Sequence, residues 1–161
     1  MQPKPDWREK GYWFPASKIG STFFKLIAPI SDKIIFRLSG GRQTAVSLVA
    51  GLPSIVLTVK GAKSGEPRTI TLLGIPDEER FIVIASNWGQ KHHPAWYYNL
   101  LANPDITASL NGKTMSYRAR QVFDSEHQQC WDKAVKVYHG YESYKQRAKR
   151  EIPIFVLEPQ Q

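Results

Sequence analysis

Residues 54–86 read SIVLTVKGAKSGEPRTITLLGIPDEERFIVIAS, and the fold class can be predicted mainly from them. It holds three runs rich in β-branched residues, at 54–60, 68–75 and 81–86. Two short segments separate the runs, GAKSGEP at 61–67 and PDEER at 76–80. Both segments are rich in residues that favour turns. Because parallel strands need a crossover of a dozen or more residues, connectors this short predict an antiparallel meander.

The chain after this meander supplies helices and further strands. The expected elements are a helix at 95–102, strands at 105–110 and 114–122, a helix from 125 to about 138, a short helix ending near 150 and a strand at 152–158. Asn111-Gly112 is a strong hairpin signal, and Ser125 with Gln128 forms a capping-box pattern. This order predicts an α+β protein built on a small antiparallel barrel.

The composition indicates one basic, globular domain. The chain has 161 residues, with 22 Lys and Arg against 14 Asp and Glu, and this net charge of +8 attracts anionic partners. A single cysteine, Cys130, excludes an internal disulfide framework. No signal peptide and no apolar run long enough to span a bilayer are found, so a cytoplasmic location is expected.

Residues 1–37 are expected to form an N-terminal arm and a basic amphipathic helix, and residues 38–161 the barrel domain. Between Ser17 and Leu38, apolar residues recur at helical spacing with lysines and arginines between them, and Pro29 interrupts the pattern. Two interpretations stay open. The helix packs on its own domain, or it rests on an anionic membrane surface or closes over a ligand.

The segment 60–68 is the best candidate anion site. It combines two glycines with the hydroxyl of Ser64 and the charges of Lys60, Lys63 and Arg68. Arginine grips phosphate with two parallel hydrogen bonds, and lysine acts as a mobile point charge. The spacing does not match a Walker P-loop. Phosphate binding and an ordinary hairpin turn are the two interpretations.

The segment 85–99, ASNWGQKHHPAWYYN, follows a strand with a glycine-containing loop and a helix N-terminus. Helix N-termini attract anions, and small polar residues at a strand end suit hydrogen bonding to a flat heterocycle. Adjacent histidines do not share a face, so no metal site is expected at His92-His93. Trp96, Tyr97 and Leu100 are expected in the core.

Three tyrosines, Tyr138, Tyr141 and Tyr144, recur every three residues. They would line an aromatic cavity with polar rims, or simply pack under the helix. Cys130 lies inside an amphipathic helix and is expected to be inert core.

Together these segments resemble the deazaflavin (F420)-dependent nitroreductases and quinone reductases, a family with a split β-barrel fold. The resemblance rests on LSGGR at 38–42, LTVKGAKSGEPR at 57–68, HPAWYYNL at 93–100, ANP at 102–104 and the three tyrosines. These motifs occur in register over residues 38–159.

The resemblance implies a coenzyme site. Lys63 and Arg68 match the loop that holds the coenzyme phosphate and its acidic tail, and Ser86 matches the stretch beside the deazaflavin ring. The expected coenzyme-binding residues are Lys60, Lys63, Ser64, Arg68, Ser86, Asn87, Trp88, Gly89 and Asn99. The expected catalytic residues are Ser86, Tyr138, Tyr141 and Tyr144. The chain has Asn87-Trp88-Gly89 where many relatives carry Lys-Gly-Gly, and Leu73 where some carry tyrosine.

The expected reaction is hydride transfer from reduced coenzyme F420 to a quinone or nitro-aromatic acceptor. FMN is the alternative coenzyme, in a split-barrel oxidoreductase of the flavin branch. A non-catalytic carrier of deazaflavin or of a hydrophobic ligand would use the same groove. A nucleic-acid-binding barrel is a further alternative, but only the positive charge and the aromatic residues suggest it. We therefore expect no nucleic-acid partner.

Overall fold

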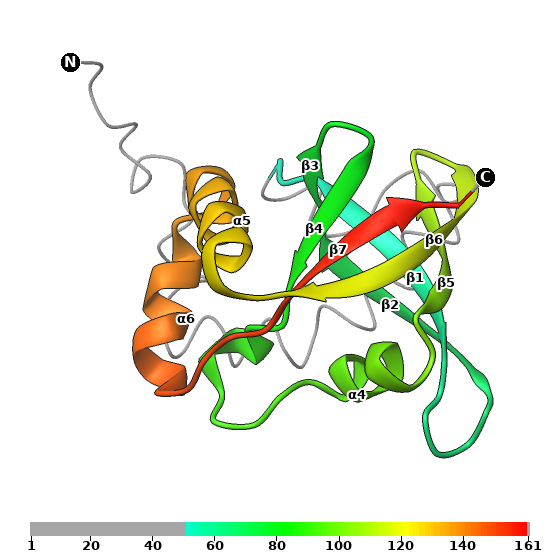
Figure 1. The fold of residues 1–161 in the computed structure, drawn as a ribbon, viewed down its shortest axis with the longest axis horizontal. Coiled ribbons are helices and arrows are strands. Elements are labelled where there is room, and N and C mark those ends of the chain that lie inside the picture. Colours follow the sequence, from blue (N-terminus) through cyan, green and yellow to red (C-terminus); the bar gives the residue numbers. More distant parts are fainter. Residues whose placement is uncertain (1–50, 161) are drawn as a thin grey trace.

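The computed structural model describes residues 51–160, and Figure 1 shows them as a curled antiparallel sheet flanked by helices. The strands are β1 (Ser54–Lys60), β2 (Pro67–Leu73), β3 (Ile75–Asp77), β4 (Arg80–Ile84), β5 (Asp105–Leu110), β6 (Lys113–Val122) and β7 (Ile154–Pro159). The helices are η1 (Asn87–Gly89), α4 (Ala95–Ala102), α5 (Asp124–Val137) and α6 (Gly140–Ala148). The predicted closing strand is confirmed, and the three β-branched runs form antiparallel strands. The predicted meander is correct only for its first hairpin, β1–β2, because β4 pairs with β7 and β3 and not with β2.

The seven strands form one sheet in the order β2-β1-β5-β6-β7-β4-β3, and all neighbours run antiparallel. The sheet curls into a half-barrel, so that β2 also contacts β4, to which it is not hydrogen-bonded. The hairpin at Asn111-Gly112 has the two positive φ values, 51° and 79°, that a type I′ turn needs. The α+β half-barrel agrees with the predicted fold class.

Two apolar cores lie on opposite faces of the curled sheet. Alternate residues of β4 divide between them: Ile82 and Ile84 pack with α5 and α6, whereas Val83 packs with the group that includes α4. The strand β7 is divided in the same way. Because both faces of these strands are buried, their sequences are continuous apolar runs without a polar alternation. Trp96 and Leu100 lie in the core as expected, whereas Tyr97 is half-buried and packs against its edge.

Two local predictions were wrong. The segment 68–75 is not one strand, because it breaks at Gly74, where a Cβ would lie 2.8 Å from Cγ2 of Ile55. The capping box at Ser125 does not form. Helix α5 begins at Asp124, with Phe123 at the N-cap and no side-chain cap hydrogen bond. Ser125 therefore lies inside the first turn, where its hydroxyl cannot serve as the N-cap acceptor.

The predictions for residues 1–37, and for the LSGGR motif at 38–42, lie outside the described residues. Between residues 51 and 160, no helix is long and apolar enough to cross a membrane.

Candidate coenzyme site

The loop between β1 and β2 is tightly closed by its own backbone. The amide of Gly61 donates to the carbonyl of Glu66 at 2.8 Å, and the amide of Gly65 donates to the carbonyl of Gly61 at 2.9 Å. A Cβ at Gly61 would lie 2.6 Å from Oγ of Ser64, and Gly65 has a φ of +71°. Only glycine meets both conditions without strain, which explains the two glycines of the motif.

Ser64 organises the polar groups of this loop. Its Oγ accepts hydrogen bonds from the amide of Glu66 at 3.3 Å and from Nη2 of Arg68 at 3.4 Å. Lys60, Lys63 and Arg68 are all exposed. Three exposed cations in one loop, together with a hydroxyl that its neighbours fix in place, form a donor set that fits a phosphate or a carboxylate-rich group. These residues therefore suit the anionic part of the predicted coenzyme.

Two asparagines, one in helix α4 and one directly after it, hold the loop between β1 and β2 in place. The side-chain oxygen of Asn99 accepts from the amide of Ala62 at 2.9 Å, and Nδ2 of Asn103 donates to the carbonyl of Lys60 at 3.3 Å. Asn99, a predicted coenzyme ligand, thus uses its oxygen to fix the loop. Asn103 was not singled out as a site residue, although it lies in the ANP motif; its link to Lys60 depends on tertiary packing.

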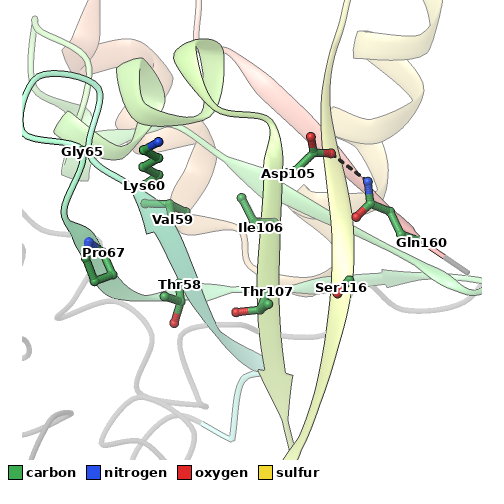
Figure 2. A pocket seen from close by; sticks show the side chains of 10 residues that line it. All are labelled: Thr58, Val59, Lys60, Gly65, Pro67, Asp105, Ile106, Thr107, Ser116 and Gln160. Atoms are coloured by element: carbon green, nitrogen blue, oxygen red, sulfur yellow. Dashed lines mark hydrogen bonds between the residues drawn. The ribbon is translucent and has the colours of Figure 1, made fainter.

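A hollow of about 390 Å³ opens beside Lys60 on the sheet face that points away from the α4 core (Figure 2). Thr58, Thr107 and Ser116 line it in a row, because Thr58 pairs with Thr107 and Thr107 with Ser116 in the register. At one side Nε2 of Gln160 donates to the carboxylate of Asp105 at 2.7 Å. The hollow therefore offers hydroxyl groups next to the basic loop. The alternation of residues along each strand could have predicted which face these hydroxyl groups lie on. Only the pairing of the strands shows that the three residues lie in one row.

The turn after β4 has an unusual backbone. Asn87 and Trp88 have φ values of 47° and 58°, and Gly89 follows with 78°. Left-handed non-glycine residues cost about 1 kcal/mol or more each, and such residues cluster at functional sites. Ser86 precedes them with 7% of its surface exposed, and its carbonyl accepts from the amide of Gly89 at 2.9 Å. The predicted ring-contacting residues therefore form one strained turn.

Helix α6 packs against this turn. The ring of Trp88 meets that of Tyr144 edge-on, with 6.1 Å between centroids, and Nη2 of Arg147 donates to the carbonyl of Trp88 at 3.0 Å. A Cβ at Gly89 would lie 3.0 Å from Cα of Tyr144. Gly89 is thus required both by its φ and by the close approach of α6.

The three predicted catalytic tyrosines gather in one buried cluster. Tyr138, Tyr141 and Tyr144 expose 4%, 4% and 3% of their surfaces. The hydroxyl oxygens of Tyr138 and Tyr144 are 3.0 Å apart, so one hydroxyl donates to the other. Burial raises the pKa of all three phenols, which keeps them protonated at neutral pH. Of the two interpretations, an aromatic cavity or packing under the helix, the structure shows the packing.

The remaining titratable candidates have structural roles. His93 stacks on Tyr97 with 4.4 Å between centroids, and burial is the main cause that lowers its pKa. Cys130 is buried, and burial raises its pKa, as expected of inert core. The described part of the chain contains no group of three His, Cys, Asp or Glu residues that could hold a metal ion.

The site therefore has two ends that α4 connects. The basic loop at 60–68 rests on the side chain of Asn99 in α4, and the strained turn at 86–89 leads into the same helix. Figure 1 shows α4 beside the curled sheet, with η1 next to α6.

The fold places the chain in the split-barrel class. It is similar to the solved F420-H2 dependent reductase FDR-A, with a TM-score of 0.62, 33% identity and coverage of 66% of this chain and 94% of that one. A second solved structure, described as a domain-swapped dimer, has a TM-score of 0.65, 30% identity and coverage of 78% of this chain and 95% of that one.

The sequence defines the family within this class. The family model described as F420H(2)-dependent quinone reductase matches residues 32–159. The F420H(2)-dependent quinone reductase Rv1261c of Mycobacterium tuberculosis is 33% identical over 108 residues, which cover 65% of this chain and 72% of that protein. The chain belongs to the F420H(2)-dependent quinone reductase family, as its motifs indicated.

Proposed function

We propose that this protein transfers a hydride from reduced coenzyme F420 to a quinone or nitro-aromatic acceptor. The observation that carries the proposal is the basic loop of a chain that belongs to this family: it exposes Lys60, Lys63 and Arg68, and Arg68 donates to the hydroxyl of Ser64. These groups would bind the phosphate and the acidic tail of the coenzyme. The family name points to F420H2 and gives no support to FMN.

The turn at the other end would contact the ring system. We assign Ser86, Asn87, Trp88 and Gly89 to this end because they form one backbone turn whose conformation is fixed by α6. Asn99 would act through the loop that it supports, because its side-chain oxygen accepts from the amide of Ala62. When bound, F420H2 supplies the hydride, and the protein supplies position and an electrostatic environment.

The tyrosine cluster would act on the acceptor. Tyr144 contacts Trp88 directly, so it lies next to the ring end of the proposed site. As a protonated phenol it could donate a hydrogen bond to an acceptor oxygen on which negative charge develops. Because its hydroxyl is paired with that of Tyr138, an acceptor would have to replace this partner. Ser86 is the second candidate donor.

The first experiment is a titration of the protein with oxidised F420, followed by intrinsic Trp fluorescence, with FMN in parallel. We expect F420 to bind, and the variants Lys63→Ala and Arg68→Ala to bind it about tenfold or more weakly, since each loses a charge-assisted contact. Lys113→Ala is a matched control, because Lys113 is an exposed cation on the β5–β6 hairpin. Binding of FMN alone, or of neither ligand, would contradict the proposal.

Turnover separates the enzyme from a carrier. An enzyme oxidises F420H2 when a quinone or nitro-aromatic compound is added, whereas a carrier binds the coenzyme and shows no turnover with any acceptor. Contact of the segment 17–38 with an anionic membrane surface stays a prediction. Flotation with anionic liposomes tests it, and flotation that is unchanged on deletion of residues 1–36 would count against it.

A further inference from the structure

Arg150 holds the strained turn from both sides. It follows α6, and its guanidinium donates from Nη2 to the carbonyl of Ala85 at 3.1 Å, before the turn. After the turn, Nε donates to the carbonyl of Gln90 at 3.1 Å and Nη2 to that of His92 at 3.2 Å. One side chain thus connects the two ends of the segment that contains Ser86.

Only a guanidinium can make this set of contacts. Nη1 of Arg150 also donates to the carbonyl of Glu151 at 3.0 Å, so donors at all three nitrogens are used. All four acceptors are backbone carbonyls, and none of the ion pairs found between residues 51 and 160 includes Arg150. Lysine carries a point charge on a flexible stem and cannot reach separated carbonyls in this fixed geometry.

The turn needs such a restraint. Asn87 and Trp88 are two consecutive non-glycine residues in the left-handed region, which an unrestrained loop would leave. Arg147 holds the middle of the turn through the carbonyl of Trp88, and Arg150 holds its flanks. We propose that Arg150 is a positioning residue that keeps the Ser86–Gly89 turn in the conformation that binds the ring end of the coenzyme.

This inference rests on the proposed function, since it assumes that the turn contacts F420. It makes a specific prediction about kinetics. If the coenzyme-binding conformation is populated only in part, the apparent affinity falls by that fraction, while the saturated complex is unchanged. Loss of Arg150 should therefore raise the Kd and KM for F420H2 and leave kcat nearly constant.

The test compares Arg150→Gln and Arg150→Lys with the control Arg120→Lys. Arg120 also makes four side-chain hydrogen bonds, to Glu126 and Glu158, so the control loses similar contacts elsewhere. Two quantities are measured: amide hydrogen exchange of residues 85–92 in protein without coenzyme, and the Kd for oxidised F420. For both Arg150 variants we expect exchange and Kd each to rise about 10- to 100-fold, with kcat within about threefold. The control should change neither quantity.

Each outcome decides the inference. Unchanged exchange would show that Arg150 does not hold the turn, and faster exchange with an unchanged Kd would show that the turn does not position F420. If Arg150→Gln fails to fold, Arg150→Lys, which keeps the charge, gives the same comparison. Failure of the wild-type protein to bind F420 would instead overturn the proposed function, and the exchange data would still report on the turn.

Discussion

Gly140, the first residue of α6, sets the packing of the tyrosine cluster. A Cβ at this position would overlap Cζ, Oη and Cε1 of Tyr138. The ring of Tyr138 is buried, and its hydroxyl is paired with that of Tyr144. In the variant Gly140→Ala the ring must therefore move, and this hydrogen bond must stretch or break.

The size of the effect follows from three contributions. Overpacking of a core costs about 1–3 kcal/mol, and the lost hydrogen bond about 1 kcal/mol. Replacing glycine by alanine restores about 0.5–1 kcal/mol by reducing the entropy of the unfolded chain. We expect a net loss of about 1–3 kcal/mol in the free energy of unfolding. For a chain of this size the Tm should fall by roughly 3–10 °C.

Urea unfolding followed by Trp fluorescence measures this loss, and Ser143→Ala in the same helix is the control. The double variant Tyr138→Leu, Gly140→Ala tests the cause, because the added methyl group then has no phenol hydroxyl to displace. In the Tyr138→Leu background the Gly140→Ala change should be close to neutral. A Gly140→Ala protein as stable as the wild type, or an equal loss in both backgrounds, would refute the overlap as the reason for this glycine.

Two further predictions concern charge and the acceptor. The Asp77 carboxylate is 6% exposed and pairs with Lys133 and, at 2.7 Å, with Arg80, and the Lys133 hydrogen bond is the main cause that lowers its pKa. Its stabilising contribution is therefore present above the unfolded pKa near 3.9 and is lost as the pH falls through the lower folded pKa. In urea titrations the free energy of unfolding should fall less steeply below about pH 4 for Asp77→Asn than for the wild type, and equal slopes would argue against this pair. Tyr144→Phe should reduce kcat with a quinone by about tenfold or more at unchanged Kd for F420; unaltered activity would remove Tyr144 from the mechanism.

The sequence alone determined most of the local structure. The hairpin at Asn111-Gly112 and the hairpin between β1 and β2 depend on neighbouring residues, and these predictions were confirmed. The third run of the predicted meander was placed wrongly, because β4 pairs with β7, which lies 70 residues further along the chain. The capping box at Ser125 failed because the helix begins one residue earlier, at Asp124, and the other errors involve residues far apart in the chain. The strand breaks at Gly74, where the side chain of Ile55 leaves no room for a Cβ, and nothing within the segment 68–75 contains this information.

The same distinction applies to the candidate site. The residues Lys63, Ser64 and Arg68 could be identified from the sequence because they lie within one loop, and their chemistry depends on residue type. Tertiary structure was needed to show that Asn99 fixes this loop from a helix 37 positions away, and that Arg150 reaches back 65 positions to Ala85. In the sequence Arg150 was one of several basic residues near the C-terminus. Its role depends on the curled sheet, which brings the end of α6 beside the turn after β4, because only packing can place backbone carbonyls around a distant guanidinium.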